Sequence, residues 1–255
     1  MNLYERIHED GVAVRRDFVR RDELDALDRA LSAARVAELP RSRQVLYTHR
    51  SPPPDAPPFT ALMDQWLNPH RFAGEASTAG VAKRIAHRLS EEWGRSLVLF
   101  QDLFLLKRQG QRPFPWHQDR AFWPVDRAEG LILWVPLRAS NGSSGALKFA
   151  TGSHLLGEQP VLDLHTGAPQ DPDAKLSFQS ADWPELAPVY GAGDAVVFSP
   201  LVFHASPAMK APGERAAWSC IFLGAETRWC HAAAPNHPMC KVVPDGALVK
   251  ETLHD

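Results

Sequence analysis

The chain has 255 residues, of which 44% are hydrophobic and 23% are charged, and its formal net charge is −2. This composition predicts a folded protein with a sizeable core and excludes an intrinsically disordered chain. A chain so close to neutral has no bulk attraction for nucleic acid or for an anionic membrane surface. No apolar run approaches the roughly 18 residues of a membrane helix. We therefore expect a soluble, cytoplasmic protein, monomeric or a small homo-oligomer, that binds neither nucleic acid nor membrane.

The N-terminal part, to about residue 94, is expected to be rich in helix after one short strand. Residues 12–18 alternate in an extended pattern, and Asp22 is a candidate N-cap for a helix. An apolar stripe at helical spacing follows it, formed by Leu24, Leu27 and Leu31. The proline-rich stretch Ser51–Phe59 predicts a loop. Ala79–Trp93 has an apolar residue at every fourth position, which predicts a second helix that Gly94 ends.

After Gly94 the pattern changes to short apolar or alternating segments separated by turn residues. These predict the strands Leu97–Lys107, Trp116–Ala121, Leu131–Arg138, Ala146–Ala150, Asp194–Phe198, Leu201–Ala205 and Ala216–Leu223. Repeated short strands indicate an antiparallel sandwich or barrel. We expect one domain over residues 1–255, with a β core at about 95–223 and a C-terminal extension at 224–255.

Three widely spaced cysteines argue against a disulfide framework. Cys230, His231, His237 and Cys240 lie close together in the extension, and all four are zinc-ligand types. Their spacing, C-H-x5-H-x2-C, is not that of a standard zinc finger. We therefore prefer a solvated coil here to a structural zinc site.

His117, Asp119 and His204 form the most informative group of polar residues. His117 and Asp119 are two residues apart in a predicted strand, where alternate residues share a face and can bind one metal ion. His204 ends an apolar strand far downstream, where an ordinary interpretation is a core histidine. Two histidines and one carboxylate leave open positions, as in non-haem iron(II) oxygenases. Arg215 begins the next apolar strand, and its guanidinium could pair with a carboxylate.

This ordered set resembles the phytanoyl-CoA dioxygenase family of iron(II)- and 2-oxoglutarate-dependent oxygenases, over roughly residues 11–223. The resemblance is densest in QDLFLLKRQG, PWHQDRAFWP, LILWVPLR, GALKFATGSH and GAGDAVVFSPLVFHAS. It implies a mainly β fold with flanking helices around a double-stranded β-helix, a jelly-roll or cupin-like barrel. It also implies that His117, Asp119 and His204 hold Fe(II) and carry catalysis.

Further site residues follow from the same resemblance. Arg215 matches the arginine that binds the distal carboxylate of 2-oxoglutarate, and Ser206 matches a hydroxyl residue that assists it. Trp134 matches a tryptophan near the cosubstrate. Phe114 and Trp123 lie close enough to the iron motif to line the pocket, although a packing role explains them equally well.

The implied reaction uses O₂ and 2-oxoglutarate to hydroxylate a small organic substrate and releases succinate and CO₂. The carboxylate of Asp119 disfavours halogenation, whereas desaturation, epoxidation and ring closure stay open. A role in secondary metabolism is favoured by analogy. The alternatives are an acyl-CoA hydroxylase of the same family, a cupin-like metalloenzyme that does not use 2-oxoglutarate, and a non-catalytic metal-binding barrel.

Two long irregular segments are candidates for contact with the substrate. Leu156–Pro188 holds five prolines and little periodicity, which is typical of a functional loop. We expect it to form a lid over the substrate, together with Ser51–Phe59. Arg41, Arg43 and Arg50 could bind the phosphates of an acyl-CoA, although solvated surface charges explain them more simply.

Overall fold

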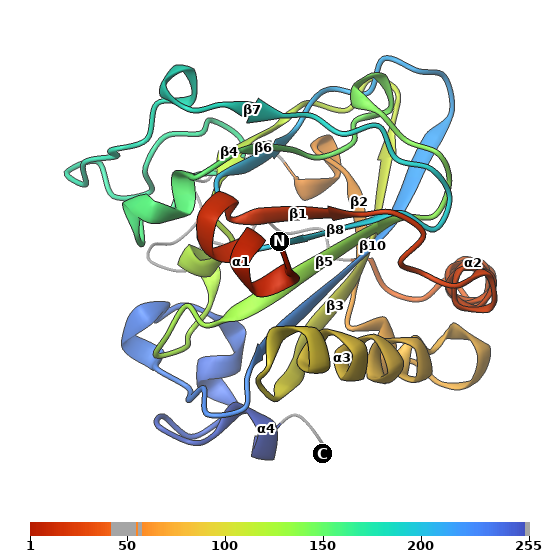
Figure 1. The fold of residues 1–255 in the computed structure, drawn as a ribbon, viewed down its shortest axis with the longest axis horizontal. Coiled ribbons are helices and arrows are strands. Elements are labelled where there is room, and N and C mark those ends of the chain that lie inside the picture. The colour runs from red at the N-terminus through yellow and green to blue at the C-terminus, as the bar shows by residue number, and fades with distance from the viewer. Residues whose placement is uncertain (42–54, 56–57, 253–255) are drawn as a thin grey trace.

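The computed structural model describes residues 1–41, 55 and 58–252, and within them two antiparallel sheets face each other (Figure 1). The larger sheet has the strand order β1 (Val12–Arg15), β8 (Ala195–Phe198), β5 (Gly130–Pro136), β10 (Glu214–Gly224), β3 (Leu97–Arg108) and β2 (Asp64–Leu67). The smaller sheet has the order β4 (Phe114–His117), β9 (His204–Ser206), β6 (Lys148–Ala150) and β7 (Glu185–Leu186). The predicted β architecture with flanking helices is confirmed.

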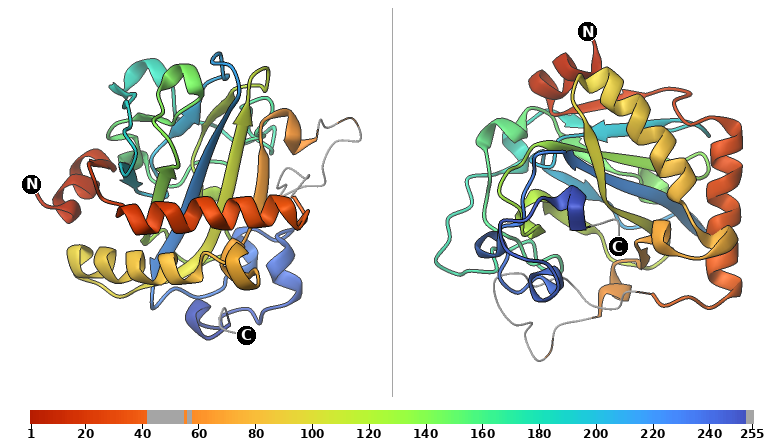
Figure 2. Two further views of the ribbon diagram at one scale, coloured as in Figure 1. Left: turned by 90° about the vertical axis from the view of Figure 1, so that its right-hand side faces the viewer. Right: turned by 90° about the horizontal axis from the view of Figure 1, so that it is seen from below.

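Helices cover the outer face of the larger sheet (Figure 2). They are α1 (Leu3–Asp10), α2 (Arg21–Val36) and α3 (Ala79–Trp93), and a short α4 (Val249–Thr252) follows near the C-terminus. The bounds of α3 agree with the prediction, because Gly94 adopts the left-handed conformation, φ 73°, that ends it. None of the helices in the described part of the chain is both long and apolar enough to cross a membrane.

The predicted N-cap of α2 is wrong. The helix begins at Arg21, and its N-cap residue is Arg20 rather than Asp22. The carboxylate of Glu23 accepts a hydrogen bond of 3.1 Å from the backbone N–H of Arg20, so a side chain inside the first turn satisfies the donor before it. Glu23 is fully buried, and Arg88 of α3 donates to both of its oxygens at 2.8 Å, which joins the two helices.

The central strands of the larger sheet are buried on both faces. In β10, Trp218, Cys220 and Phe222 pack against the helices, whereas Ala217 and Ile221 face the smaller sheet. Side chains of β10 thus alternate between two apolar clusters, one under the helices and one between the two sheets. The face toward the smaller sheet forms one wall of the cavity described below.

A buried carboxylate holds the segment after β2 in place. Asp102 of β3 is fully buried and lies 2.6 Å from Nδ1 of His70, and Trp218 Nε1 donates to it at 2.9 Å. The Thr78 hydroxyl, which precedes α3, also donates to this carboxylate. The 3₁₀ turn Pro69–Arg71 is thereby tied to the edge of the cavity.

The long segment 156–188 packs mainly against the smaller sheet. It contains a 3₁₀ turn at Ser180–Asp182 and all of β7, and Phe178 stacks on Phe203 with ring centroids 3.8 Å apart. Leu162 and Phe178 share a small apolar cluster with Phe203. The other predicted loop, Ser51–Phe59, falls almost wholly outside the described residues.

The C-terminal extension holds no metal-binding arrangement within the described residues. All three cysteines are free, as expected, and Cys240 Sγ donates to the carbonyl of Ala234 at 3.4 Å. The group of histidine and cysteine residues there does not converge, so only the triad described next brings metal-ligand atoms together in the described part of the chain.

Candidate metal centre and active-site cavity

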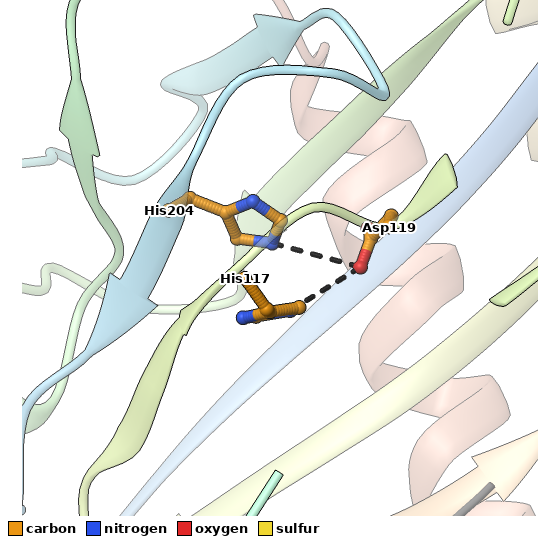
Figure 3. Close-up of side chains that lie close together, drawn as sticks. All are labelled: His117, Asp119 and His204. Carbon is orange, nitrogen blue, oxygen red and sulfur yellow. Dashed lines mark ion pairs between the residues drawn. The ribbon is translucent and has the colours of Figure 1, made fainter. Parts of the chain in front are cut away.

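His117, Asp119 and His204 converge between the two sheets (Figure 3). His117 and His204 are directly paired residues of β4 and β9, and their ring centroids lie 4.2 Å apart. Asp119 Oδ1 lies 3.3 Å from His117 Nε2 and 3.7 Å from His204 Nε2. One ligand atom from each residue lies within 4.8 Å of the other two, a spacing that a single ion can bridge.

Asp119 reaches the triad by a different route from the one expected. The predicted strand Trp116–Ala121 ends at His117, and Asp119 has helical backbone angles, φ −74° and ψ −34°, before the 3₁₀ turn Arg120–Phe122. The expectation of a shared strand face was therefore wrong. A turn directly after His117 brings the carboxylate back beside the imidazole.

The donor atoms of the triad fit a divalent cation such as iron. His117 Nδ1 lies 2.8 Å from the carbonyl of Pro115, and His204 Nδ1 lies 3.2 Å from the carbonyl of Val202. A carbonyl only accepts, so each Nδ1 carries the proton and each Nε2 presents a lone pair toward Asp119. Two neutral imidazoles and one carboxylate are the ligand set of an iron site with open positions.

The electrostatics favour these protonation states. Burial, with a further effect of His117, lowers the pKa of His204 to about 4, which keeps the ring neutral at ordinary pH. Burial alone would raise the pKa of Asp119, but His204 and His117 outweigh it, so the pKa of this carboxyl lies below its ordinary value.

Arg215 lines another wall of the same cavity, and a second buried cation, Lys107, lies beside it. They are paired residues of β10 and β3, and both are at most 5% exposed. Arg215 donates to the carbonyl of Gly145 at 2.7 Å, while its Nε and Nη1 have no partner in the described part of the chain. Lys107 Nζ donates to the hydroxyl and carbonyl oxygens of Ser206 at 3.2 and 3.3 Å. Neither cation has an acidic partner among the described residues, so a buried anion is missing here.

Burial has a clear effect on both cations. It lowers the pKa of Arg215 to about 10, and together with the charge of Arg215 it lowers the pKa of Lys107 to about 7. A carboxylate bound beside them would relieve both penalties. The site therefore fits one end of a dicarboxylate such as 2-oxoglutarate.

Gly145 allows the chain to approach these cations closely. Its φ is +73°, and a Cβ there would lie 2.9 Å from Lys107 Cδ and 3.2 Å from the carbonyl oxygen of Pro207. A side chain would push Lys107 away from Ser206, whose hydroxyl also donates to the Gly145 carbonyl at 2.8 Å.

A cavity of about 340 Å³ joins the triad and Arg215. The other residues that the sequence pointed to also line it, namely Phe114, Trp123, Trp134 and Ser206. The guanidinium carbon of Arg215 lies 5.3 Å from the ring centroid of Trp134. Of the segment 156–188, Leu164 lines the cavity, whereas His237, Pro238 and Met239 line it from the C-terminal extension.

The sequence indicates Lys107 only as an alternative cation to Arg215, from its place in QDLFLLKRQG, where a lysine in a buried strand needs a partner. Sequence reasoning missed other polar residues in and near the cavity. Gln65 and Gln101 carry no comparable pattern. Tyr190 lies outside the motifs; its buried hydroxyl has no partner within residues 1–41, 55 and 58–252, and its ring lies 5.2 Å from that of Trp134.

Comparisons with known proteins agree with this geometry. The family model described as Phytanoyl-CoA dioxygenase (PhyH) matches residues 7–217. A curated relative, the probable alpha-ketoglutarate-dependent hypophosphite dioxygenase of Stutzerimonas stutzeri, is 27% identical over 95 residues. That match spans 37% of this chain and only a third of the relative's length, 33%.

Solved structures share the fold at low sequence identity. The non-heme alpha ketoglutarate dependent carbocyclase SnoK from nogalamycin biosynthesis superposes with a TM-score of 0.75 at 16% identity, over 96% of this chain and 91% of that one. The epimerase SnoN, in complex with Fe³⁺, alpha ketoglutarate and nogalamycin RO, gives 0.72 at 22% identity, over 96% and 93%. EctD from S. alaskensis, with 2-oxoglutarate and 5-hydroxyectoine, gives 0.64 at 20% identity, over 89% and 76%. Since the family model covers most of the chain, this protein belongs to the phytanoyl-CoA dioxygenase (PhyH) family.

Proposed function

We propose that this protein is an Fe(II)- and 2-oxoglutarate-dependent oxygenase that hydroxylates a small organic substrate. One observation carries the proposal. A single cavity holds both a triad whose ligand atoms converge and the buried guanidinium of Arg215, which is paired with Lys107 and has no acidic partner in the described part of the chain.

The two ends of the cavity bind different groups. His117, Asp119 and His204 hold the iron, and Arg215 and Lys107 hold the distal carboxylate of 2-oxoglutarate. Iron, 2-oxoglutarate and O₂ supply the oxidising chemistry, in which 2-oxoglutarate becomes succinate and CO₂ while the substrate is oxidised. The protein orients these groups and keeps water away from them.

Aromatic side chains supply the dry environment around the triad. Trp123 and Phe122 are nearly fully buried and line the cavity beside the metal ligands. Trp134 lies under the guanidinium of Arg215, where the face of its ring attracts a cation. Such walls strengthen each electrostatic contact inside the site because they exclude water.

The alternative functions explain fewer features of the cavity than the proposed oxygenase does. A cupin-like metalloenzyme without 2-oxoglutarate leaves the Arg215–Lys107 pair unexplained, and so does a non-catalytic metal-binding barrel. A cavity of about 340 Å³ lies at the small end for ligand sites and favours a compact substrate over a whole acyl-CoA. Arg41, one of the three arginines considered for CoA phosphates, lies 3.8 Å from Asp64, and Arg43 and Arg50 lie outside the described residues.

The neighbouring folds are compatible with a role in secondary metabolism. SnoK and SnoN come from nogalamycin biosynthesis, SnoK as a carbocyclase and SnoN as an epimerase. Because one fold carries such different outcomes, hydroxylation is proposed from the general chemistry of the site and not from these names.

Succinate formation tests the proposal directly. Purified protein supplied with Fe(II), 2-oxoglutarate and air should form succinate and CO₂ slowly without substrate and faster with the correct one. The matched control is the Asp119→Ala variant under the same conditions. A wild-type protein that binds iron but forms no more succinate than this variant would overturn the proposal.

A further inference from the structure

The C-terminal extension forms part of the cavity wall. His237, Pro238 and Met239 line the cavity, and the extension is fastened to the barrel by Trp229, which is 1% exposed and lies 5.7 Å from the ring of Phe100. The backbone N–H of Cys230 donates to the carbonyl of Pro124 at 2.8 Å. The turn that carries His237 is therefore anchored to the same walls as the metal centre.

The hydrogen bonds of His237 determine which of its nitrogens carries the proton. The backbone N–H of Met239 donates to His237 Nδ1 at 3.1 Å, so Nδ1 acts as an acceptor. A neutral imidazole with an accepting Nδ1 carries its hydrogen on Nε2. That Nε2 makes no hydrogen bond with the described residues, and His237 lines the cavity. Burial lowers the pKa of His237 to about 4, so the ring stays neutral.

The larger sheet presents further uncharged polar groups to the same cavity. Gln65 of β2, Gln101 of β3 and Ser219 of β10 all line it, and none of their side chains has a hydrogen-bond partner in the described structure. Amide and hydroxyl groups both donate and accept, which suits alcohols, ketones and ethers.

Full charges are scarce on this side of the cavity. Asp119 is the one acidic residue lining it in the described part of the chain, and it belongs to the triad. Arg71 lines the rim, but its side chain is exposed to solvent. A buried amine would therefore lack a counter-charge, and a buried carboxylate or phosphate would face neutral groups.

We propose that His237 is a specificity-determining residue, whose Nε2–H donates a hydrogen bond to an uncharged oxygen of a compact, mainly apolar substrate. This inference rests on the proposed function and names its substrate class. The apolar remainder of the substrate packs against Leu103, Leu105 and Met239, which line the same cavity.

The first test reads the tautomer of His237 and needs no substrate. Nitrogen-15 NMR of the histidine-labelled full-length protein should show His237 neutral with its proton on Nε2 from pH 7 down to about pH 5, and the His237→Gln variant assigns the resonance. A proton on Nδ1, or a charged ring at pH 6, would overturn the inference and leave the proposed function untouched.

The second test measures binding of matched probes under anaerobic conditions with Fe(II) and 2-oxoglutarate present. The probes are built on two skeletons, cyclohexane and tetralin. Each skeleton is tested as the plain hydrocarbon and with a ketone, a carboxylate or an amine group, and dissociation constants are measured by calorimetry. At least one ketone should bind, and its carboxylate and amine analogues should bind more weakly. The absence of ketone binding, or tighter binding of a charged analogue, would overturn the inference.

Variants of His237 connect this preference to one hydrogen bond. His237→Phe keeps a ring but removes the donor, and should weaken ketone binding roughly 3- to 10-fold, the value of one neutral hydrogen bond. His237→Gln, which keeps an N–H donor, should retain most of the ketone affinity of the wild type. His231→Phe, in the same extension but away from the cavity wall, is the matched control. Equal ketone binding by wild type and His237→Phe would contradict the role of His237. Selective binding without any succinate formation would instead refute the proposed function.

Discussion

At the scale of single residues, the candidate metal centre depends on the orientation of two imidazoles and one carboxylate. Backbone carbonyls of Pro115 and Val202 hold the imidazoles of His117 and His204 with Nε2 facing Asp119. Backbone carbonyls of the chain itself therefore orient both imidazoles.

Removal of the carboxylate should therefore affect the metal more than the fold. We expect Asp119→Ala to lower succinate formation at least about 100-fold, because a triad has no spare ligand. Iron content after reconstitution should fall in parallel, whereas the circular dichroism spectrum should stay unchanged. The same loss of activity is expected for His117→Ala and His204→Ala. Full turnover by any of the three variants would exclude this triad as the metal site.

The Arg215–Lys107 pair should control affinity for 2-oxoglutarate. Arg215→Ala removes a buried charge-assisted contact, so we expect the KM for 2-oxoglutarate to rise about 30-fold or more. Lys107→Met should raise it about 10-fold, since a buried ammonium makes one fewer directed contact. Iron binding by both variants serves as the control. A variant with an unchanged KM would show that its residue does not contact the cosubstrate.

Lys107 should also make this affinity depend on pH. In the free protein the pKa of Lys107 is lowered to about 7 by burial and by Arg215. A bound carboxylate favours the charged amine and raises that pKa, so binding takes up a proton above about pH 7. The dissociation constant for 2-oxoglutarate should then increase as pH rises from 7 to 9, by up to about tenfold per unit. In Lys107→Met this dependence should disappear, and a persistent slope would point to another group.

At the scale of elements, the two segments that border the substrate side differ in how they are held. The loop over residues 156–188 packs on the smaller sheet and sends Leu164 to the cavity, whereas the extension contributes His237, Pro238 and Met239. The lid role that the sequence suggested for the loop stays a prediction, and the extension supplies more residues of the cavity wall.

A substitution of Phe178 tests whether the loop over residues 156–188 stabilises the fold or contributes to activity. Its ring is 7% exposed and stacks on Phe203, so Phe178→Ala should reduce the free energy of unfolding by about 3–5 kcal/mol. Urea denaturation measures this change. Succinate formation without substrate should stay within about twofold of wild type, because the residues proposed to hold iron and 2-oxoglutarate lie elsewhere. A large loss of that activity with unchanged stability would instead place the loop at the active site.

At the scale of the whole molecule, buried neutral histidines should make the metal-free protein sensitive to mild acid. The pKa values of His204 and His237 are lowered to about 4, below their ordinary value of about 6.5. Between these values the unfolded chain binds protons that the folded chain does not, so stability falls as pH decreases from about 6.5 to 4.

Thermal unfolding measures this effect. The Tm of the metal-free protein should fall by at least about 3 °C between pH 7 and pH 5. In His237→Phe, which removes one of the two groups, the fall should be smaller. An identical fall in this variant would assign the effect to other residues.

The sequence by itself determined the features that depend on near neighbours. Helix α3 was predicted with its bounds, because apolar residues every four positions and a terminal glycine act within a few turns. Most strands of the core were placed correctly because alternation and turn residues are local as well. The order of His117, Asp119, His204 and Arg215 along the chain indicated their chemistry through the resemblance to a family.

Only the tertiary structure decided which of these side chains meet, and how. Asp119 reaches the triad through a turn and not along a strand, and Lys107 lies beside Arg215 because β3 and β10 pair in that register. His237 faces the cavity because the extension folds back onto the barrel. Strand register and the docking of distant segments arise from packing over the whole chain, which local patterns along the sequence do not encode.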